Sequence, residues 1–233
     1  MGNPAKFALI AVAGLAVVGV GGWYGARAAI EHVVHDYILS HPEILPEAME
    51  NLQRRQATQA LAGIRSTVET PFPGAVLGNP NGKVTLVEFS DYACGYCRQS
   101  LPDVANLIAK NPDLRIIVRE LPIISPHSPD AARMALAAAE QGKYAQFHDA
   151  MYAAGQVDDA AIAAAAAKAG LDLTRARRVA SSATVAQEIG RNLEIAQRLG
   201  FSGTPSWIVG DRLIPGAVGF DQLSAAISAA RGS

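Results

Sequence analysis

Two cysteines three residues apart, Cys94 and Cys97, are the only cysteines in this 233-residue chain, and they follow closely on an apolar run. That run, Val84 to Phe89, predicts a buried strand, and the residues after it predict a helix from Cys94 to Ala109. A further apolar run, Leu114 to Arg119, predicts a second strand and completes a β-α-β unit. The cysteine pair therefore lies between a strand and the first turn of a helix.

The segment from Ser128 to about Leu199 predicts only helices and is rich in alanine, with breaks near Gly142, Gly155, Gly170 and Ser181. The remaining elements are two strands and a helix: Ser206 to Val209, Arg212 to Ile214, and Phe220 to Ala230. Gly210-Asp211 between the two strands is typical of a tight hairpin turn. Strands on both sides of a helical segment predict an α/β domain with a helical insertion.

The position of Cys94 at a helix N-terminus favours the reactive thiolate, because unpaired backbone N–H groups and the helix dipole stabilise negative charge there. Cys97 lies on the same helix face, where its sulfur can form a disulfide with that of Cys94. We expect an exposed Cys94 to attack a substrate disulfide or to be attacked by a substrate thiol. Cys97 then resolves the mixed disulfide.

A metal site and an inert buried pair are the other uses of such a pair. A thiolate metal site needs four soft ligands, and the chain has no second cysteine pair; His127 and His148 fall in the helical segment. A structural disulfide across so short a loop removes little entropy from the unfolded chain. The motif therefore favours redox chemistry, and no metal or other cofactor is expected.

Glu88 is an acidic residue in the middle of the first apolar strand. If that strand is central and parallel, both of its faces are covered and the carboxyl group is buried. Burial disfavours the charged form and so raises the pKa of a carboxyl group. A buried acid beside the pair can accept the proton of Cys97. The alternative is a side chain that reaches solvent or pairs with Arg119.

Composition narrows the range of partners. The net charge is −1 and the chain has no run of lysine or arginine, so nucleic acid is not an expected partner. Half of the residues are hydrophobic, which is enough for one core and a small satellite domain or an extended arm.

Residues 1–28 are predicted to be a membrane anchor or a signal peptide. A charge-free apolar stretch from Phe7 to Ala26 follows Lys6 and is about long enough to span a membrane, with Trp23 near its end as in an interfacial aromatic belt. The same residues fit a signal peptide with a cleavage site near Ala28. Both interpretations place the remainder in the periplasm, anchored to the inner membrane by residues 7–26 or released, where a disulfide can persist.

Residues 29–70 predict a helical arm outside the core. Ser40 and Glu43 fit a capping box, and Pro46 fits the first position of a helix that runs through Arg65. Apolar residues fall near one stripe of that helix: Leu45, Met49, Leu52, Leu61 and Ile64. The stripe either packs on its own domain or binds a second copy, and the heptad pattern, interrupted by glutamines, leaves both open.

The segment from Thr70 to Gly82 is dense in proline and glycine and predicts a loop or linker at a domain boundary. The predicted organisation is therefore an anchor or signal (1–28), a helical arm (29–70), a first part of the α/β domain (71–127), a helical insertion (128–200) and a second part of that domain (201–233).

The run from Val87 to Cys97, the helical insertion and Gly203-Thr204-Pro205 resemble the DsbA-like branch of the thioredoxin superfamily over most of residues 75–231. The resemblance implies a thioredoxin fold with an inserted helical domain. It also implies that Pro205 is cis, faces the cysteine pair and presents backbone to a bound peptide. In the same family Thr204 is implied to tune the nearby sulfur, and Glu88 is implied to be the buried acid.

Residues 36–55 are similar to the N-terminal segment of the suppressor-of-copper-sensitivity protein C (ScsC) group of that family. This arm is associated there with oligomerisation, so the resemblance favours a homo-oligomer formed through residues 31–70. The strong oxidases of the family carry Pro-His between the cysteines and usually Val before the cis-proline. This chain has Gly95-Tyr96 and Thr204 instead, which is similar to the periplasmic disulfide isomerases.

These features predict a thiol-disulfide oxidoreductase of the bacterial cell envelope, an isomerase or reductase that acts on exported proteins with cysteines. Tyr96 offers the thiolate only a weakly acidic hydroxyl, so the couple is expected to be less oxidising than that of the strong oxidases. A membrane thiol reductase is the implied redox partner. The alternatives are a DsbA-type dithiol oxidase, a copper-handling thiol protein and a chaperone-like binder.

Overall fold

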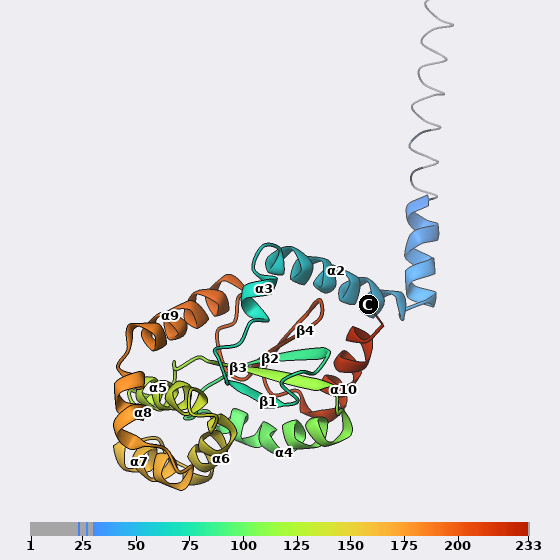
Figure 1. Cartoon of the computed structure of the whole chain (residues 1–233). Coiled ribbons are helices and arrows are strands. Elements are labelled where there is room, and N and C mark those ends of the chain that lie inside the picture. Colours follow the sequence, from blue (N-terminus) through green and yellow to red (C-terminus); the bar gives the residue numbers. More distant parts are fainter. Residues whose placement is uncertain (1–22, 24–26, 28–29, 233) are drawn as a thin grey trace, which may run out of the picture. The chain divides into compact units, whose positions relative to one another are not determined.

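The computed structural model describes residues 23, 27 and 30–232 (Figure 1). The chain divides into two compact units, one that ends at Leu52 and one that begins at Gln53. The choice between an anchor and a cleaved signal concerns residues that, apart from Trp23 and Arg27, lie outside the described part of the chain. Among the described residues, no helix has both the length and the hydropathy that crossing a membrane requires.

The described part of the first unit is helical, with one helix over residues 30–40 and the start of α2 (Ile44–Leu61). The predicted capping box is wrong, because Ser40 ends the first helix and its hydroxyl donates to the carbonyl oxygen of Asp36 at 2.7 Å. The predicted bounds of the second helix are also wrong. It begins two residues before Pro46 and ends at Leu61, since Gly63 adopts a φ of 77° before the short α3 (Arg65–Val68).

The apolar stripe of α2 divides into two parts. Leu45, Met49 and Leu52 expose between 50% and 55% of their surface. Ala57 and Leu61 are buried in the second unit. The C-terminal end of α2 therefore packs on its own domain, which was one of the two interpretations of the stripe. The N-terminal end of α2 presents exposed apolar side chains.

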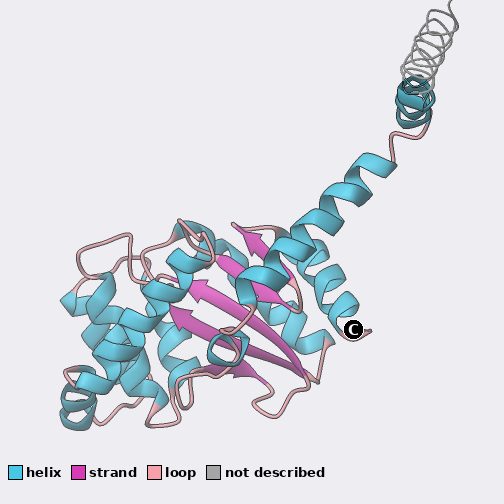
Figure 2. Ribbon diagram, turned by 90° about the horizontal axis from the view of Figure 1, so that it is seen from above, coloured by secondary structure: helices cyan, strands magenta, loops and turns pink. Residues whose placement is uncertain are grey.

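Within the described residues, the second unit is built on a five-stranded sheet with the order β1-β3-β2-β4-β5 (Figures 1 and 2). The strands are β1 (Val76–Gly78), β2 (Val84–Ser90), β3 (Leu114–Glu120), β4 (Ser206–Val209) and β5 (Arg212–Pro215). β2 and β3 are parallel, and the other pairs are antiparallel. The predicted β-α-β unit and C-terminal hairpin are confirmed, and β2 is central with a strand on each side.

The prediction that residues 70–82 form only a loop is wrong, because β1 lies there and pairs with β3, with Leu77 opposite Ile116. A strand of three residues is too short to show an alternating pattern, and prolines and glycines surround it. Gly78 ends the strand with a φ of 73°, and a Cβ there would lie 2.8 Å from the carbonyl oxygen of Leu114. This close backbone approach explains the glycine.

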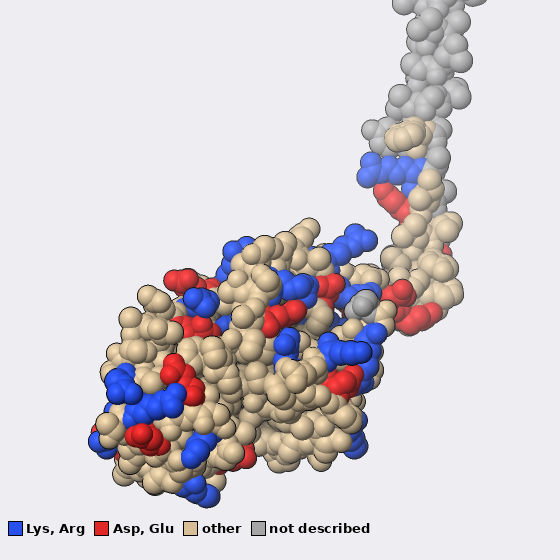
Figure 3. All heavy atoms as spheres, in the orientation of Figure 1, with Lys and Arg blue, Asp and Glu red and all other residues tan. Residues whose placement is uncertain are grey.

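Helices cover both faces of the sheet (Figure 2). α4 (Gly95–Lys110) and α10 (Gly219–Ala230) pack on one face, and α3 with α9 (Ala183–Arg198) pack on the other. The other helices of the insertion pack on one another: α5 (Ser128–Ala139), α6 (Tyr144–Ala154), α7 (Asp159–Lys168) and α8 (Leu173–Ala180). The predicted breaks between these helices are confirmed. On the visible face of the domain, basic and acidic side chains are interspersed (Figure 3).

Alternation along β2 divides its side chains between two buried clusters. Leu86 belongs to the cluster that contains Cys97 and the buried side of α4, whereas Val87 and Phe89 belong to the cluster under α9. Successive side chains of a strand point to opposite faces, so Glu88 and Ser90 lie on the Leu86 side. The sheet therefore carries Glu88 on the face that α4 covers.

Candidate active site

Cys94 is the N-cap residue of α4, with extended backbone angles (φ −80°, ψ 114°). Its sulfur accepts a hydrogen bond from the backbone N–H of Cys97 at 3.3 Å, which satisfies one of the free donors of the first helical turn. Cys97 is fully buried. The expectation of an exposed Cys94 is wrong, because only 3% of the residue is accessible. The two sulfurs are nevertheless neighbours, as the spacing predicted.

The loop before the pair is held by Asp91, a residue that the sequence analysis did not single out. One carboxylate oxygen of Asp91 accepts hydrogen bonds from the backbone N–H of Ala93 at 2.8 Å and from the hydroxyl of Ser128 at 2.7 Å. The other accepts from the backbone N–H groups of Ile123 and Ile124 at 2.8 and 2.9 Å. An aspartate after a strand signals a local turn, but only the fold brings these distant donors to it.

The loop before β4 covers Cys94. The Thr204-Pro205 peptide bond is cis, as the resemblance implied. The thiol of Cys94 donates a hydrogen bond to the carbonyl oxygen of Thr204 at 3.1 Å. The side chain of Thr204 has a buried hydroxyl that finds no hydrogen-bond partner among the described residues. The backbone of Thr204 is therefore the part that touches the sulfur.

Glu88 is buried, and burial raises the pKa of its carboxyl group to about 7, against a smaller lowering by a hydrogen bond with Ser90. The alternative that Glu88 reaches solvent or pairs with Arg119 is wrong. Arg119 lies opposite Phe89, on the other face of the sheet, and forms an ion pair with Glu188 at 3.0 Å.

Cys97 lies close enough to Glu88 for the two groups to interact electrostatically. Burial, followed by the negative charge of Glu88, raises the pKa of the Cys97 thiol to about 12. Hydrogen bonds from Ser90 and from the backbone of Asp91 lower it by less. The thiol of Cys97 and the carboxyl group of Glu88 therefore compete for one negative charge.

Gly95 and Tyr96, between the cysteines, face solvent. Tyr96 is 64% exposed, and a Cβ on Gly95 would meet no atom within 4 Å. Neither residue is thus required by packing. Among the described residues, the one group of three side chains spaced to hold a metal is His127, Asp130 and Asp159, which contains no cysteine.

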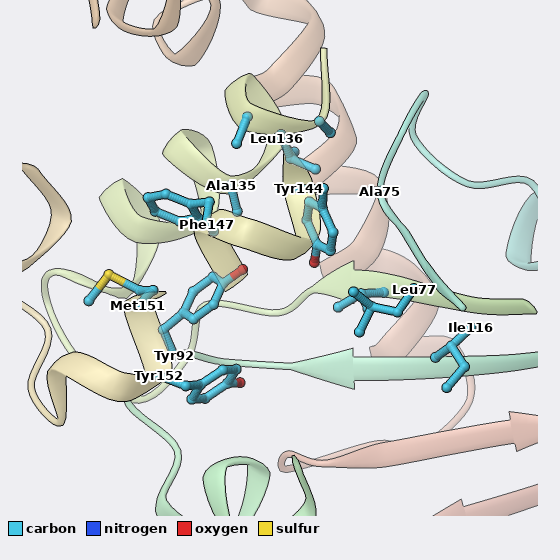
Figure 4. Close-up of a cluster of buried hydrophobic side chains, with 14 of the residues drawn as sticks. Ala75, Leu77, Tyr92, Ile116, Ala135, Leu136, Tyr144, Phe147, Met151 and Tyr152 are labelled. Carbon is cyan, nitrogen blue, oxygen red and sulfur yellow. The ribbon is translucent and has the colours of Figure 1, made fainter. Parts of the chain in front are cut away.

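Tyr92, Tyr144 and Tyr152 were not predicted as site residues, and they are buried in the same core cluster as the two cysteines. Figure 4 shows these three tyrosines. The hydroxyl of Tyr152 lies 2.7 Å from that of Ser90 and donates to the carbonyl oxygen of Asp91 at 3.1 Å. The hydroxyls of Tyr92 and Tyr144 donate to the carboxylate of Glu120 at 3.2 and 2.7 Å. Burial raises the pKa of all three tyrosines, so their hydroxyls serve as hydrogen-bond donors.

Comparison with known families assigns the chain. Residues 85–228 match the model of the DSBA-like thioredoxin domain, which covers more than half of the sequence. This chain belongs to the DsbA-like thioredoxin family. Residues 27–59 match a second model, the copper resistance protein ScsC N-terminal domain. The chain is therefore a thiol-disulfide oxidoreductase of the DsbA/ScsC type.

Solved structures of similar proteins support the family assignment. A thioredoxin-like oxidoreductase from Silicibacter pomeroyi is 42% identical, with a TM-score of 0.64 over 68% of this chain and 92% of that one. A periplasmic thioredoxin-like protein from Salmonella enterica serovar Typhimurium is 31% identical, with a TM-score of 0.65 over 73% and 97%. ScsC from Proteus mirabilis, in a transitional conformation, is 27% identical, with a TM-score of 0.68 over 89% and 98%.

Among curated proteins, this chain matches one part of a larger protein. The Na(+)/H(+) antiporter NhaA 1 of Salinispora arenicola is 33% identical over 158 residues. That region is 66% of this chain, and this chain spans only 24% of the antiporter.

Proposed function

We propose that this protein is a disulfide isomerase or reductase of the cell envelope, in which Cys94 reacts with client proteins and Cys97 resolves the mixed disulfide. The observation that carries the proposal is the burial of Cys97 beside Glu88, which raises the pKa of the Cys97 thiol to about 12. A resolving thiol that stays protonated at neutral pH leaves the mixed disulfide with time to rearrange. Slow resolution suits an isomerase better than a fast oxidase.

The reaction begins when the thiolate of Cys94 attacks a client disulfide. A disulfide forms between Cys94 and one client sulfur, and the other client sulfur leaves as a thiolate. In isomerisation, a second client thiolate attacks the mixed disulfide and releases Cys94 unchanged. In reduction, the carboxylate of Glu88 takes the proton of Cys97, whose sulfur attacks that of Cys94; the client leaves as a thiolate and a Cys94–Cys97 disulfide remains. A membrane thiol reductase is then needed to reduce it.

The residues around the pair have proposed roles in client binding and redox tuning. Tyr96 is exposed beside the cysteines, where it can contact a client, and it brings no positive charge to the thiolate. The carbonyl oxygen of Thr204 lies on the sulfur of Cys94, and Pro205 follows it in the same loop. Gly95 leaves the first helical turn open to a client chain.

Self-association through residues 31–70 is the second part of the proposal. The match of residues 27–59 to the ScsC N-terminal model supports it, and so do the exposed apolar side chains of Leu45, Met49 and Leu52. An oligomer places several reducing sites around one misfolded client. We place the protein in the periplasm, where it acts on exported proteins and is either anchored by residues 7–26 or released after cleavage near Ala28.

Refolding assays test the direction of the chemistry. The reduced protein is expected to accelerate the refolding of a scrambled substrate with several disulfides, and the oxidised protein to oxidise a reduced peptide only slowly. Cys94→Ser should abolish both activities, whereas Cys97→Ser should keep part of the refolding activity, because client thiols can still release Cys94. Rapid peptide oxidation without faster refolding would instead identify a dithiol oxidase.

The oligomer is tested by light scattering on the exported part of the chain. The triple variant Leu45→Ser, Met49→Ser, Leu52→Ser should lower the mass to that of a monomer and should reduce refolding of scrambled substrate more than reduction of a peptide. The matched control is Gln53→Ser with Gln56→Ser, which changes exposed polar residues of the same helix. An unchanged mass in the triple variant contradicts self-association through this face.

A further inference from the structure

A second buried carboxyl group, Glu120, lies on the same face of the sheet as Glu88. It is the last residue of β3, lies opposite Ser90 of β2, and is only 1% exposed. Glu88 precedes Ser90 by two residues on the adjacent strand, so the two acids are diagonal neighbours with Cα atoms about 8 Å apart. Two acids therefore share the buried cluster that also contains Cys97.

The side chain of Glu120 is held by hydroxyl groups and not by a cation. Tyr144 and Tyr92 both donate to the same carboxylate oxygen, and their hydroxyls lie near each other in Figure 4. No residue in the described part of the chain forms an ion pair with Glu120. The preceding residue, Arg119, faces the opposite side of the sheet.

The other titratable groups around Glu120 come from three directions. Glu88, Asp91 and Tyr92 belong to β2 and the loop after it, and Cys97 belongs to α4. The α6 helix contributes Tyr144, His148 and Tyr152; the ring of His148 packs between those of Tyr144 and Tyr152. In the described part of the chain, no lysine or arginine is among the groups that shift the pKa of Glu88 or Glu120.

We propose that Glu120 is a positioning residue that acts on the proton of Cys97 through Glu88. Inside the buried cluster, the carboxyl groups of Glu120 and Glu88 carry one negative charge between them. Ionisation of either carboxyl group opposes ionisation of the other, as for any two acids in a site of low dielectric. Near neutral pH Glu88 carries the charge and can act as the base, while Glu120 keeps its proton. At higher pH both acids ionise, and formation of the Cys97 thiolate then adds a third negative charge.

The protonation of Glu120 agrees with this geometry. Burial above all, with smaller contributions from the charges of Asp91 and Glu88, raises the pKa of its carboxyl group to about 8, although the hydrogen bonds from Tyr144 and Tyr92 lower it. The proposal rests on the exchange chemistry of Cys94 and Cys97 given above. It does not depend on whether the protein acts as an isomerase or an oxidase.

The resolving step can be measured alone by attaching thionitrobenzoate to Cys94 and following the release of the coloured thiol as Cys97 attacks. The full chain should show two inflections in the pH dependence of this rate, near pH 7 and near pH 8. Glu120→Gln keeps an acceptor for both tyrosines and should remove the upper inflection only. Tyr144→Phe removes a donor that stabilises the carboxylate, so it should move the upper inflection to higher pH.

Two further variants separate charge coupling from a structural effect. Glu88→Gln should move the remaining inflection to lower pH, because the neighbouring charge is gone. Glu140→Gln, which changes an exposed acid, should leave both inflections in place. A Glu120→Gln profile that superposes on that of the unmodified protein overturns the proposal. If Cys97 releases no thionitrobenzoate at any pH, the proposed resolving role of Cys97 fails instead.

Carboxyl NMR of the unmodified protein provides a test that needs no folded variant. With glutamate labelled at its side-chain carboxyl carbon, two signals are expected to titrate well above the ordinary range, and each is expected to respond to the titration of the other. A single raised titration, or two that are independent, overturns the sharing of charge by Glu88 and Glu120.

Discussion

Arg119 and Glu120 are consecutive residues, both fully buried, and they lie on opposite faces of the central sheet. On its face, Arg119 donates to the side chains of Glu188 and Asn192 and to the carbonyl oxygens of Thr67, Val68 and Thr70. These bonds join β3 to α9 and to the segment that enters the domain. Every nitrogen of this guanidinium has an acceptor, so its charge is fully paired.

On the other face, Glu88 and Glu120 receive hydrogen bonds from hydroxyl groups, and neither forms an ion pair with any of the residues that the structure describes. Both carboxyl groups consequently have raised pKa values. This domain therefore buries charge in two ways. The paired charge joins elements of the fold, whereas the unpaired acids lower stability at neutral pH and place groups that titrate beside the cysteine pair.

The largest effect is expected on the paired face. Arg119→Met leaves Glu188 without its buried partner and three carbonyl groups without a donor, which should lower the free energy of unfolding by about 3–5 kcal/mol. Urea denaturation measures the loss. Activity per folded molecule should not change, because Arg119 faces away from the cysteines.

Arg191→Met is the matched control. Arg191 also pairs with Glu188, at 3.0 Å, but it is 53% exposed, so its loss should cost less than about 1 kcal/mol. Equal losses in the two variants would show that burial of the pair does not matter.

The next effect concerns the pH dependence of stability. The folded protein holds the protons of Glu88 and Glu120 above the pH at which the unfolded chain releases them, so stability should fall as the pH rises from about 4.5 through 7 to 8. The contribution of Glu88 is about 3 kcal/mol, from a shift of its pKa from 4.5 to about 7.

Urea denaturation at several pH values checks this sign. Glu88→Gln should reduce the fall between about pH 4.5 and pH 7 and should make the protein more stable than the unmodified one at the upper end. A pH dependence that Glu88→Gln leaves intact would mean that Glu88 does not hold its proton in the folded state.

The smallest effect in energy is on the rate of resolution. Glu88→Gln removes the base for Cys97 and should slow the release of a thiol from Cys94 about 100-fold near neutral pH, equivalent to about 2.7 kcal/mol. Stopped-flow absorbance with a thionitrobenzoate adduct measures it. The expected outcome is a rate loss without any loss of stability, opposite to that for Arg119→Met.

Local patterns were enough to predict much of this protein. The cysteine pair at a strand-to-helix junction, the four breaks of the insertion and the C-terminal hairpin depend on residues close in sequence, and all are where the sequence places them. Glu88 was also predictable, because a carboxyl group in the middle of an apolar run must be buried if the strand is central. Glu120, at the end of the next apolar run, carries the same signal.

Other features depended on contacts between distant residues. The carboxylate of Asp91 accepts hydrogen bonds from Ile123, Ile124 and Ser128. The guanidinium of Arg119 donates to α9 and to residues 67–70. No sequence pattern marks either set of partners. The same is true of β1, which is only three residues long and exists because β3 offers it an edge.

The sequence thus predicts the cysteine pair and an acid near it. How these groups are surrounded depends on the tertiary structure. The parallel register of β2 and β3 places Glu120 on the face of Glu88 and Arg119 on the other, and a shift of one residue would exchange them. Register is set by the packing of the whole sheet between its helices, and no short segment of sequence contains that information.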